Sequence, residues 1–198
     1  MKKTKNKKIT LKELQEILIE TGLRIAKRGE GALFVVGEIS YKPLIEQKVP
    51  SFKINENSKL LESLAMIDGA VIIKPDGFLE AYGVMIKTTK TIKNFGTRHS
   101  AAISAAKNDN LVVLVSEEDK KIKILQKGKM IMQIDALQKN VEKSVPQMVD
   151  ILESVGAGAI GVVGASVLAP TVGIALLPGI VVFGSAYYLA KLLTSRFR

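Results

Sequence analysis

The stretch IDGAVIIKPDGFLEAYGVMIK, residues 67–87, decides the fold class of this chain. Val71–Ile73 form a short β-branched run of the kind that fills a buried strand. Pro75, Asp76 and Gly77 follow with the residues that tight turns prefer. Phe78–Ile86 are then long and apolar enough to return as a second strand. This stretch therefore predicts a β-hairpin.

Four more strands are expected on either side of this hairpin. ALFVVGEI, Ala32–Ile39, is a short β-branched run that suits a buried strand better than a helix. LVVLVSEED, Leu111–Asp119, has the same character. KIKILQKGKMIMQID, Lys121–Asp135, predicts a second hairpin with Lys127–Lys129 at its tip.

Helical patterns alternate with these strands. Thr10 and Glu13 have the spacing of a capping box, and leucine and isoleucine residues recur at helical intervals from there to Lys27-Arg28. Ser58–Met66 predicts a short helix with Ser58 as its N-cap, and Gly96–Lys107 predicts another with Thr97 as its N-cap. The alternation indicates an α/β domain over residues 10–135, a mixed sheet flanked by helices.

The composition narrows the classes of partner and of chemistry. The formal charge of +10 over 198 residues favours an anionic partner, which nucleic acid, nucleotide or anionic lipid would all satisfy. The absence of cysteine excludes disulfides and thiolate zinc sites, and a single histidine excludes a metal-binding histidine pair. No Walker loop or dinucleotide-binding glycine fingerprint occurs.

The N-terminal residues 1–9 form a basic tail with five lysines and no apolar segment of the kind that secretory signals contain. Two interpretations remain open for it: a solvated, disordered arm, or a segment attracted to an anionic membrane surface at roughly 1 kcal/mol per basic residue. Without an export signal, the domain that follows is expected in the cytoplasm.

The C-terminal part changes character. Residues 136–154 predict an amphipathic linker helix interrupted by Pro146, and no charged residue occurs from Val155 until Lys191. Because about 20 apolar residues span a bilayer, residues 155–194 predict a hydrophobic transmembrane helical hairpin, with Val155–Leu177 and Gly179–Leu193 as its two spans. Basic residues on both sides favour cytoplasmic ends. The alternatives are a helical pair buried in an oligomer and a single tilted span.

Three short stretches carry candidate chemistry. Gly96–His99, at an expected helix start, offers backbone N–H groups, a hydroxyl, a guanidinium and an imidazole, which together suit an anion. Asp68-Gly69-Ala70 places a carboxylate and two small residues at the mouth of a strand, where a metal or ligand can approach. Ser116-Glu117-Glu118 ends another strand. Each stretch also has an ordinary alternative: a surface histidine, a turn, and a solvated strand end.

Four motifs together resemble the diadenylate cyclase domain, the family that makes cyclic di-AMP from two ATP molecules. They are GALFVVGE (Gly31–Glu38), DGAVII (Asp68–Ile73), GTRHSAA (Gly96–Ala102) and VSEE (Val115–Glu118), and they occur in the order and approximate spacing of that family. The resemblance extends over about residues 31–133 and leaves the C-terminal segment outside it.

The resemblance implies a reaction, partners and site residues. The 3′-hydroxyl of each ATP would attack the α-phosphate of the other and release pyrophosphate, so a homo-oligomer with face-to-face active sites is expected, and nucleic acid is not an expected partner. Asp68 would hold Mg²⁺ or Mn²⁺, with Gly69 and Ala70 shaping the site. The ATP-binding residues implied by the motifs are Thr97, Arg98, His99, Ser116, Glu117 and Glu118.

Two positions depart from the family pattern. Ser100 stands where the motif has a second arginine, and Ile67 precedes Asp68 where some membrane-bound relatives carry histidine. The first hypothesis is a diadenylate cyclase, a metal-dependent nucleotidyltransferase tethered to the membrane by lipid contacts of its C-terminal segment, with a cytoplasmic catalytic domain. The alternative is a catalytically weakened nucleotide or cyclic-dinucleotide sensor on the same fold, and a third is a basic membrane scaffold protein.

Overall fold

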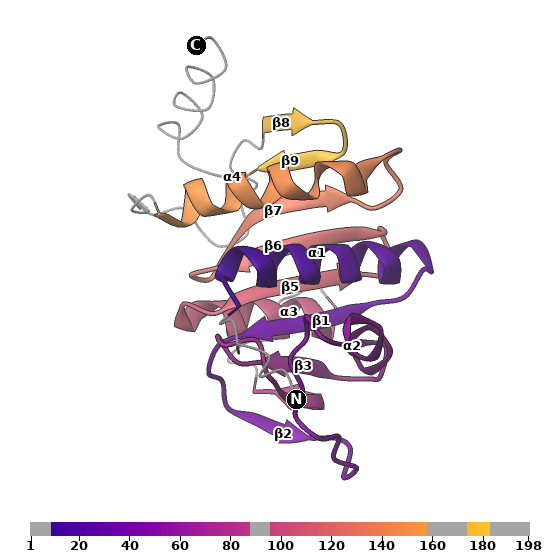
Figure 1. Ribbon diagram of the computed structural model, residues 1–198, viewed down its shortest axis with the longest axis vertical. Coiled ribbons are helices and arrows are strands. Elements are labelled where there is room, and N and C mark those ends of the chain that lie inside the picture. Colours follow the sequence, from indigo (N-terminus) through magenta and orange to yellow (C-terminus); the bar gives the residue numbers. More distant parts are fainter. Residues whose placement is uncertain (1–8, 88–95, 158–173, 183–198) are drawn as a thin grey trace, which may run out of the picture.

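A nine-stranded mixed sheet, covered by helices on both faces, organises the chain in a computed structural model that describes residues 9–87, 96–157 and 174–182 (Figure 1). The helices are α1 (Leu11–Lys27), α2 (Ser58–Ala65), α3 (Thr97–Ala105) and α4 (Val145–Ala157). The strands are β1 (Ala32–Val36), β2 (Tyr41–Pro43), β3 (Ala70–Ile73), β4 (Leu79–Ile86), β5 (Leu111–Ser116), β6 (Lys121–Gln126), β7 (Lys129–Asp135), β8 (Ile174–Leu177) and β9 (Ile180–Val182).

The strand order is β2-β4-β3-β1-β5-β6-β7-β9-β8, which places β1 near the middle of the sheet. β1 pairs in parallel with β3 and antiparallel with β5. The expected hairpins are both present, as β3–β4 and β6–β7. β2 was not expected, because its three residues, Tyr41–Pro43, lie in a proline-containing loop and form a short edge strand, where proline is tolerated.

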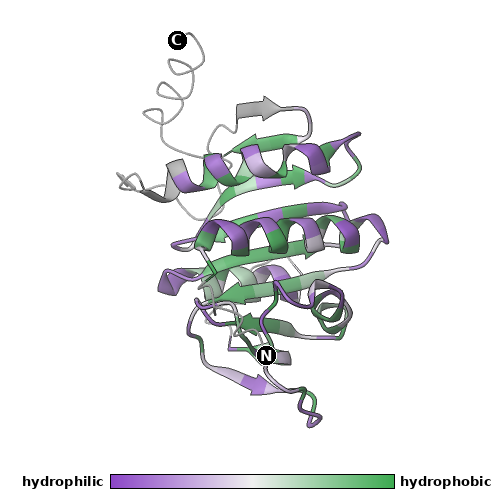
Figure 2. Ribbon diagram, in the orientation of Figure 1, coloured by the Kyte–Doolittle hydropathy of each residue, from purple (hydrophilic) through white to green (hydrophobic). Residues whose placement is uncertain are grey.

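Side chains of the central strands alternate between two cores. On β1, Phe34 belongs to the core that contains α1, α2 and α4, whereas Leu33 and Val35 belong to the core under α3. Successive side chains of a strand point to opposite faces, so a wholly apolar strand must be buried on both. Figure 2 shows the resulting apolar strands behind α1 and α4, which carry hydrophilic residues on the side that faces the viewer.

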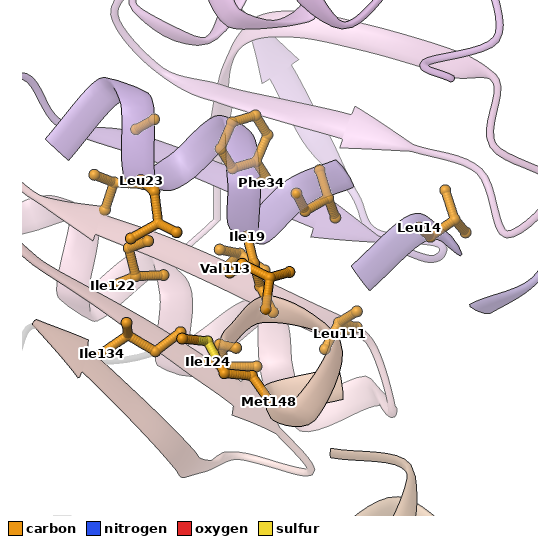
Figure 3. Close-up of a cluster of buried hydrophobic side chains, with 14 of the residues drawn as sticks. Leu14, Ile19, Leu23, Phe34, Leu111, Val113, Ile122, Ile124, Ile134 and Met148 are labelled. Atoms are coloured by element: carbon orange, nitrogen blue, oxygen red, sulfur yellow. The ribbon is translucent and has the colours of Figure 1, made fainter. Parts of the chain in front are cut away.

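The larger core is built around α1. Its capping box is formed as expected, with the Thr10 hydroxyl accepting from the Glu13 N–H and Glu13 accepting from the Thr10 N–H. Figure 3 shows Leu14, Ile19 and Leu23 of this helix gathered with apolar side chains of the sheet and with Met148 of α4. Residues well beyond the hairpin Lys121–Asp135 thus complete the same hydrophobic core.

Two helix starts differ from the expectation by one residue. Asn57, rather than Ser58, is the N-cap of α2, because its side-chain oxygen accepts from the Leu60 N–H at 3.2 Å. Gly96, rather than Thr97, is the N-cap of α3, and Thr97 is the first helical residue. The helices themselves lie where the sequence predicts them.

The expected linker helix over residues 136–154 begins later. Residues 136–140 form turns, a 3₁₀ turn covers Val141–Ser144, and α4 follows over Val145–Ala157. Pro146 does not interrupt this helix, because it lies in the first turn, where a missing N–H costs nothing. Val145, Met148 and Val149 are almost completely buried.

The prediction of a C-terminal helical hairpin is wrong for residues 174–182. These residues form the strands β8 and β9, joined by a turn at Pro178-Gly179. β9 pairs with β7 through the register Met132↔Val182 to Ile134↔Ile180, which satisfies backbone groups along β7 that would otherwise lack partners. The β-branched residues Ile180–Val182 suit a strand better than a helix.

The other parts of that hairpin, residues 158–173 and 183–194, lie outside the described residues, as do residues 1–8 of the basic tail. Among the helices that are described, none combines the length and the apolar character that crossing a bilayer requires.

Candidate functional site

Three loop-proximal segments meet at one edge of the sheet. Since β1 is parallel to β3 and antiparallel to β5, the beginnings of β1 and β3 and the end of β5 lie at the same edge. Residue Asp68 precedes β3, Gly31 precedes β1, and Ser116 ends β5. The N-terminus of α3 reaches the same place, because its residues line a cavity together with those of the strands.

That cavity has a volume of about 240 Å³. Most of the residues expected to form the site line it, namely Asp68, Thr97, Arg98, His99, Ser116, Glu117 and Glu118, together with Gly96, Leu114 and Val115. The chain folds so that motifs separated by up to about fifty residues of sequence become neighbours.

Gly69 and Ala70 are not among the lining residues of this cavity. Gly69 has a φ of +104°, and a Cβ at this position would lie 2.7 Å from the backbone nitrogen of Val84. Ala70 is 2% exposed inside β3. The absence of a Cβ lets Gly69 lie against the backbone of β4, and the Gly69 N–H donates to the Asp68 Oδ1 at 2.9 Å. Gly69 therefore helps to fix the position of Asp68 although it does not line the cavity.

Arg98 links the three segments. Its guanidinium lies 3.6 Å from the Asp68 Oδ1 and 3.4 Å from the Glu117 Oε2. Gly31 makes room for it, because a Cβ there would be 2.6 Å from the Arg98 Nη1. Gly31 occurs in the GALFVVGE motif, but the sequence did not predict its contact with Arg98. No local pattern shows which side chain packs against a given glycine.

His99 has a partner that the sequence did not indicate. The Nε2 atom of His99 lies 2.9 Å from the Nζ of Lys123 on β6, and Lys123 in turn forms an ion pair with Asp119 at 3.0 Å. Lys123 pairs across the sheet with Leu114, which lines the cavity, so its side chain lies on the same face as α3. The contact depends on the register between β5 and β6, which no local pattern in the sequence indicates.

The environment shifts the pKa values of this cluster. Burial, followed by the charge of Lys123, lowers the pKa of His99 below its ordinary value of 6.5, against smaller opposing effects of Asp119 and Glu118. Burial alone would raise the pKa of Asp119, but hydrogen bonds from Ser116 and Lys123 and nearby lysine charges outweigh it and hold that pKa low. Asp119 is thus a carboxylate and His99 a neutral imidazole at pH 7.

The N-terminus of α3 is open toward a ligand. No side chain of the described residues caps this helix, and a Cβ on Gly96 would meet nothing within 4 Å. Backbone N–H groups at a helix start attract anions, and here they stand beside the guanidinium of Arg98. A phosphate group suits this combination of donors.

The acidic groups point to a need for cations. Three carboxylates, those of Asp68, Glu117 and Glu118, line the cavity with one guanidinium, so a polyphosphate would enter only with its charge partly neutralised. Within the described residues, no group of three or more acidic, histidine or cysteine side chains could enclose a metal ion. Asp68, whose side chain is 91% exposed, fits an ion held by one carboxylate, water and substrate phosphates, which is how Mg²⁺ binds at many nucleotide sites.

Known proteins resemble this chain in sequence. Residues 20–130 match the family model described as the DisA bacterial checkpoint controller nucleotide-binding domain. A diadenylate cyclase of Methanocaldococcus jannaschii is 32% identical over 143 residues, which cover 65% of this chain and 46% of that protein. A diadenylate cyclase of Haloferax volcanii is 28% identical over 146 residues, covering 63% of this chain and 52% of the relative. The chain spans about half the length of these relatives.

A solved structure supports the fold. The crystal structure of a double mutant of DacA from Staphylococcus aureus matches with a TM-score of 0.50 at 21% identity, covering 72% of this chain and 94% of that one. At this identity the likeness shows the α/β architecture alone. The family model covers more than half of the chain and includes the segments that carry Asp68, Arg98, His99 and Glu117, and the chain therefore belongs to the diadenylate cyclase domain family.

Proposed function

We propose that this protein condenses two ATP molecules into cyclic di-AMP with release of pyrophosphate. The observation that carries the proposal is the meeting of Asp68, Arg98 and Glu117 around one cavity at the open N-terminus of α3, in a chain of this family. Nucleotidyl transfer depends mainly on in-line positioning and on neutralising phosphate charge, and these groups can do both.

Each group has a definite part in that chemistry. The N–H groups at the start of α3 and the Arg98 guanidinium would hold phosphate oxygens, and Arg98 would exchange its present carboxylate partners for them. Asp68 would hold Mg²⁺ or Mn²⁺, and such an ion, when bound, supplies charge neutralisation and activates the attacking hydroxyl. Glu117 and Glu118 stand at the rim, where hydroxyl groups of the ribose would find acceptors.

Two copies of the chain acting face to face are part of this proposal. A cavity of about 240 Å³ is smaller than the roughly 300–1,000 Å³ of sites that enclose a small molecule. The Asp68 side chain is 91% exposed, so the site lacks a wall on that side. The site of a second copy, placed opposite the first, would bring the second nucleotide and would also supply the missing wall.

The test is product identification with the full chain. Incubation with ATP and either Mg²⁺ or Mn²⁺ is expected to yield cyclic di-AMP and pyrophosphate by mass spectrometry, at a rate that rises steeply with protein concentration because the active unit is an oligomer. Absence of cyclic di-AMP under both metals, with a folded and oligomeric protein, would contradict the proposal.

A nucleotide or cyclic-dinucleotide sensor is the second candidate, favoured by one observation. Ser100 stands at the motif position of a second arginine and is 3% exposed within α3. Among the described residues that line the cavity, Arg98 supplies the one guanidinium. A weaker positive charge lowers catalysis more than binding. Calorimetric binding of ATP or cyclic di-AMP without any turnover would favour the sensor.

We also propose that the chain associates with a membrane, leaving the nucleotide site in the cytoplasm. The support is compositional: residues 158–173 and 183–190 carry no charge, and five lysines lie within residues 1–8. The full chain is expected to float with vesicles containing anionic lipid, and to do so less at high salt. Recovery of the protein in the lipid-free fraction at low salt would refute this association.

A further inference from the structure

A chain of polar contacts leads from the turn after β5 to the imidazole of the cavity. Asp119 forms an ion pair with Lys123 at 3.0 Å, and the Lys123 Nζ lies 2.9 Å from the His99 Nε2. The Lys123 side chain is only 14% exposed, and Ser116 also hydrogen-bonds to Asp119. These contacts connect three segments: α3, the β5–β6 turn and β6.

The direction of the last contact follows from the chemistry of the two groups. A lysine ammonium has three donors and no acceptor, and here it forms an ion pair with Asp119. The His99 Nε2 must therefore accept, and the proton of a neutral imidazole must sit on Nδ1. A doubly protonated ring would place an N–H against the ammonium.

We propose that Lys123 is a positioning residue that holds His99 as a neutral imidazole protonated on Nδ1, so that His99 serves the site as a hydrogen-bond donor, neither as a cation nor as a general base. Nε2 is engaged by Lys123 and Nδ1 already carries its proton, so the ring has no lone pair with which to accept a proton from a substrate hydroxyl.

The charges around His99 agree with this assignment. Lys123 faces it from β6, Asp119 and Glu118 face it from the β5–β6 turn, and Arg98 is its neighbour on α3. Burial and the Lys123 ammonium lower the His99 pKa, and the two carboxylates only partly oppose them. Lys123 thus fixes both the position and the protonation state of the ring.

His99 is the only histidine of the chain, which makes the test unambiguous. Full-length protein with ¹⁵N-labelled histidine shows one imidazole in NMR spectra, and the nitrogen shifts report directly which atom carries the proton. The expected spectrum at pH 7 is that of the Nδ1-protonated tautomer, with a titration midpoint below 6.5. In Lys123→Met the midpoint is expected to rise toward 6.5 and the Nε2-protonated tautomer to appear.

Two further variants separate positioning from a general loss of charge. Lys123→Arg keeps a cationic donor and is expected to retain the Nδ1 tautomer. Lys129→Met removes the same charge at the far end of the β6–β7 hairpin, and it is expected to leave the imidazole signals unchanged. A protonated Nε2 in the parent, or unchanged signals in Lys123→Met, would overturn the proposal.

The catalytic consequence, which rests on the proposed cyclase function, has its own readout. Lys123→Met is expected to lower kcat about 10-fold or more with a smaller effect on KM. The reason is that a misplaced hydrogen-bond donor mainly weakens stabilisation of the transition state. If neither the parent protein nor any variant forms cyclic di-AMP, the proposed cyclase function is wrong, and the NMR spectra still decide which tautomer His99 adopts.

Discussion

Asp68→Asn is expected to lower the rate of cyclic di-AMP formation by about 10²–10³-fold without unfolding the protein. The Asp68 side chain is 91% exposed, so its replacement does not disturb the hydrophobic core. Asparagine keeps the oxygen that accepts from the Gly69 N–H, and the local turn is therefore retained. What disappears is the negative charge that would hold a divalent ion beside the phosphates, and an electrostatic contribution of this kind is worth several kcal/mol.

The chain offers a matched control at the other end of the same strand. Asp76, in the β3–β4 turn, likewise accepts a backbone N–H through its Oδ1, from Phe78 at 3.3 Å. Asp76→Asn makes the same chemical change away from the cavity, and full activity is expected. Product formation followed by mass spectrometry, beside melting curves of all three proteins, measures the effect. Similar rates for Asp68→Asn and Asp76→Asn would remove Asp68 from the reaction.

The fold was predictable where the signals are local. The capping box at Thr10 and Glu13 and the two hairpins around Pro75–Gly77 and Lys127–Lys129 follow from a few neighbouring residues. The β8–β9 hairpin was missed because it lies in a long uncharged run, whose length favours a membrane helix pair more strongly than the β-branched residues Ile180–Val182 favour a strand. Residues 180–182 form a strand because they pair with the edge of β7, and this long-range pairing cannot be recognised in the sequence.

The site was predictable to the extent that its residues lie in contiguous motifs. Asp68, Arg98 and Glu117 each stand in such a motif, and the structure brings them together. Lys123 lies in an ordinary basic hairpin, and its contact with His99 depends on the register between β5 and β6. Long-range contacts through a neighbouring strand leave no periodic or spacing signal in the sequence.

Gly69→Ala is expected to destabilise the fold by about 2–4 kcal/mol, combining backbone strain with a steric clash. The φ of +104° belongs to a region that residues with a Cβ rarely adopt. The added methyl would also lie 2.7 and 2.8 Å from the nitrogen and oxygen of Val84 and 2.9 Å from the carbonyl carbon of Gly83. These are backbone atoms of a paired strand, so they cannot move aside as a side chain would.

The same substitution is expected to lower activity at least about 100-fold, because relief of the clash must move β3 away from β4 and carry Asp68 with it. Gly96→Ala provides the stability control: the φ of Gly96 is −61°, and a Cβ there meets no atom of the described residues within 4 Å. Since alanine is a poorer N-cap than glycine, a loss within about 1 kcal/mol is expected. Urea denaturation of both variants measures the difference, and equal stabilities would show that the β3–β4 approach at Gly69 is not the constraint on this site.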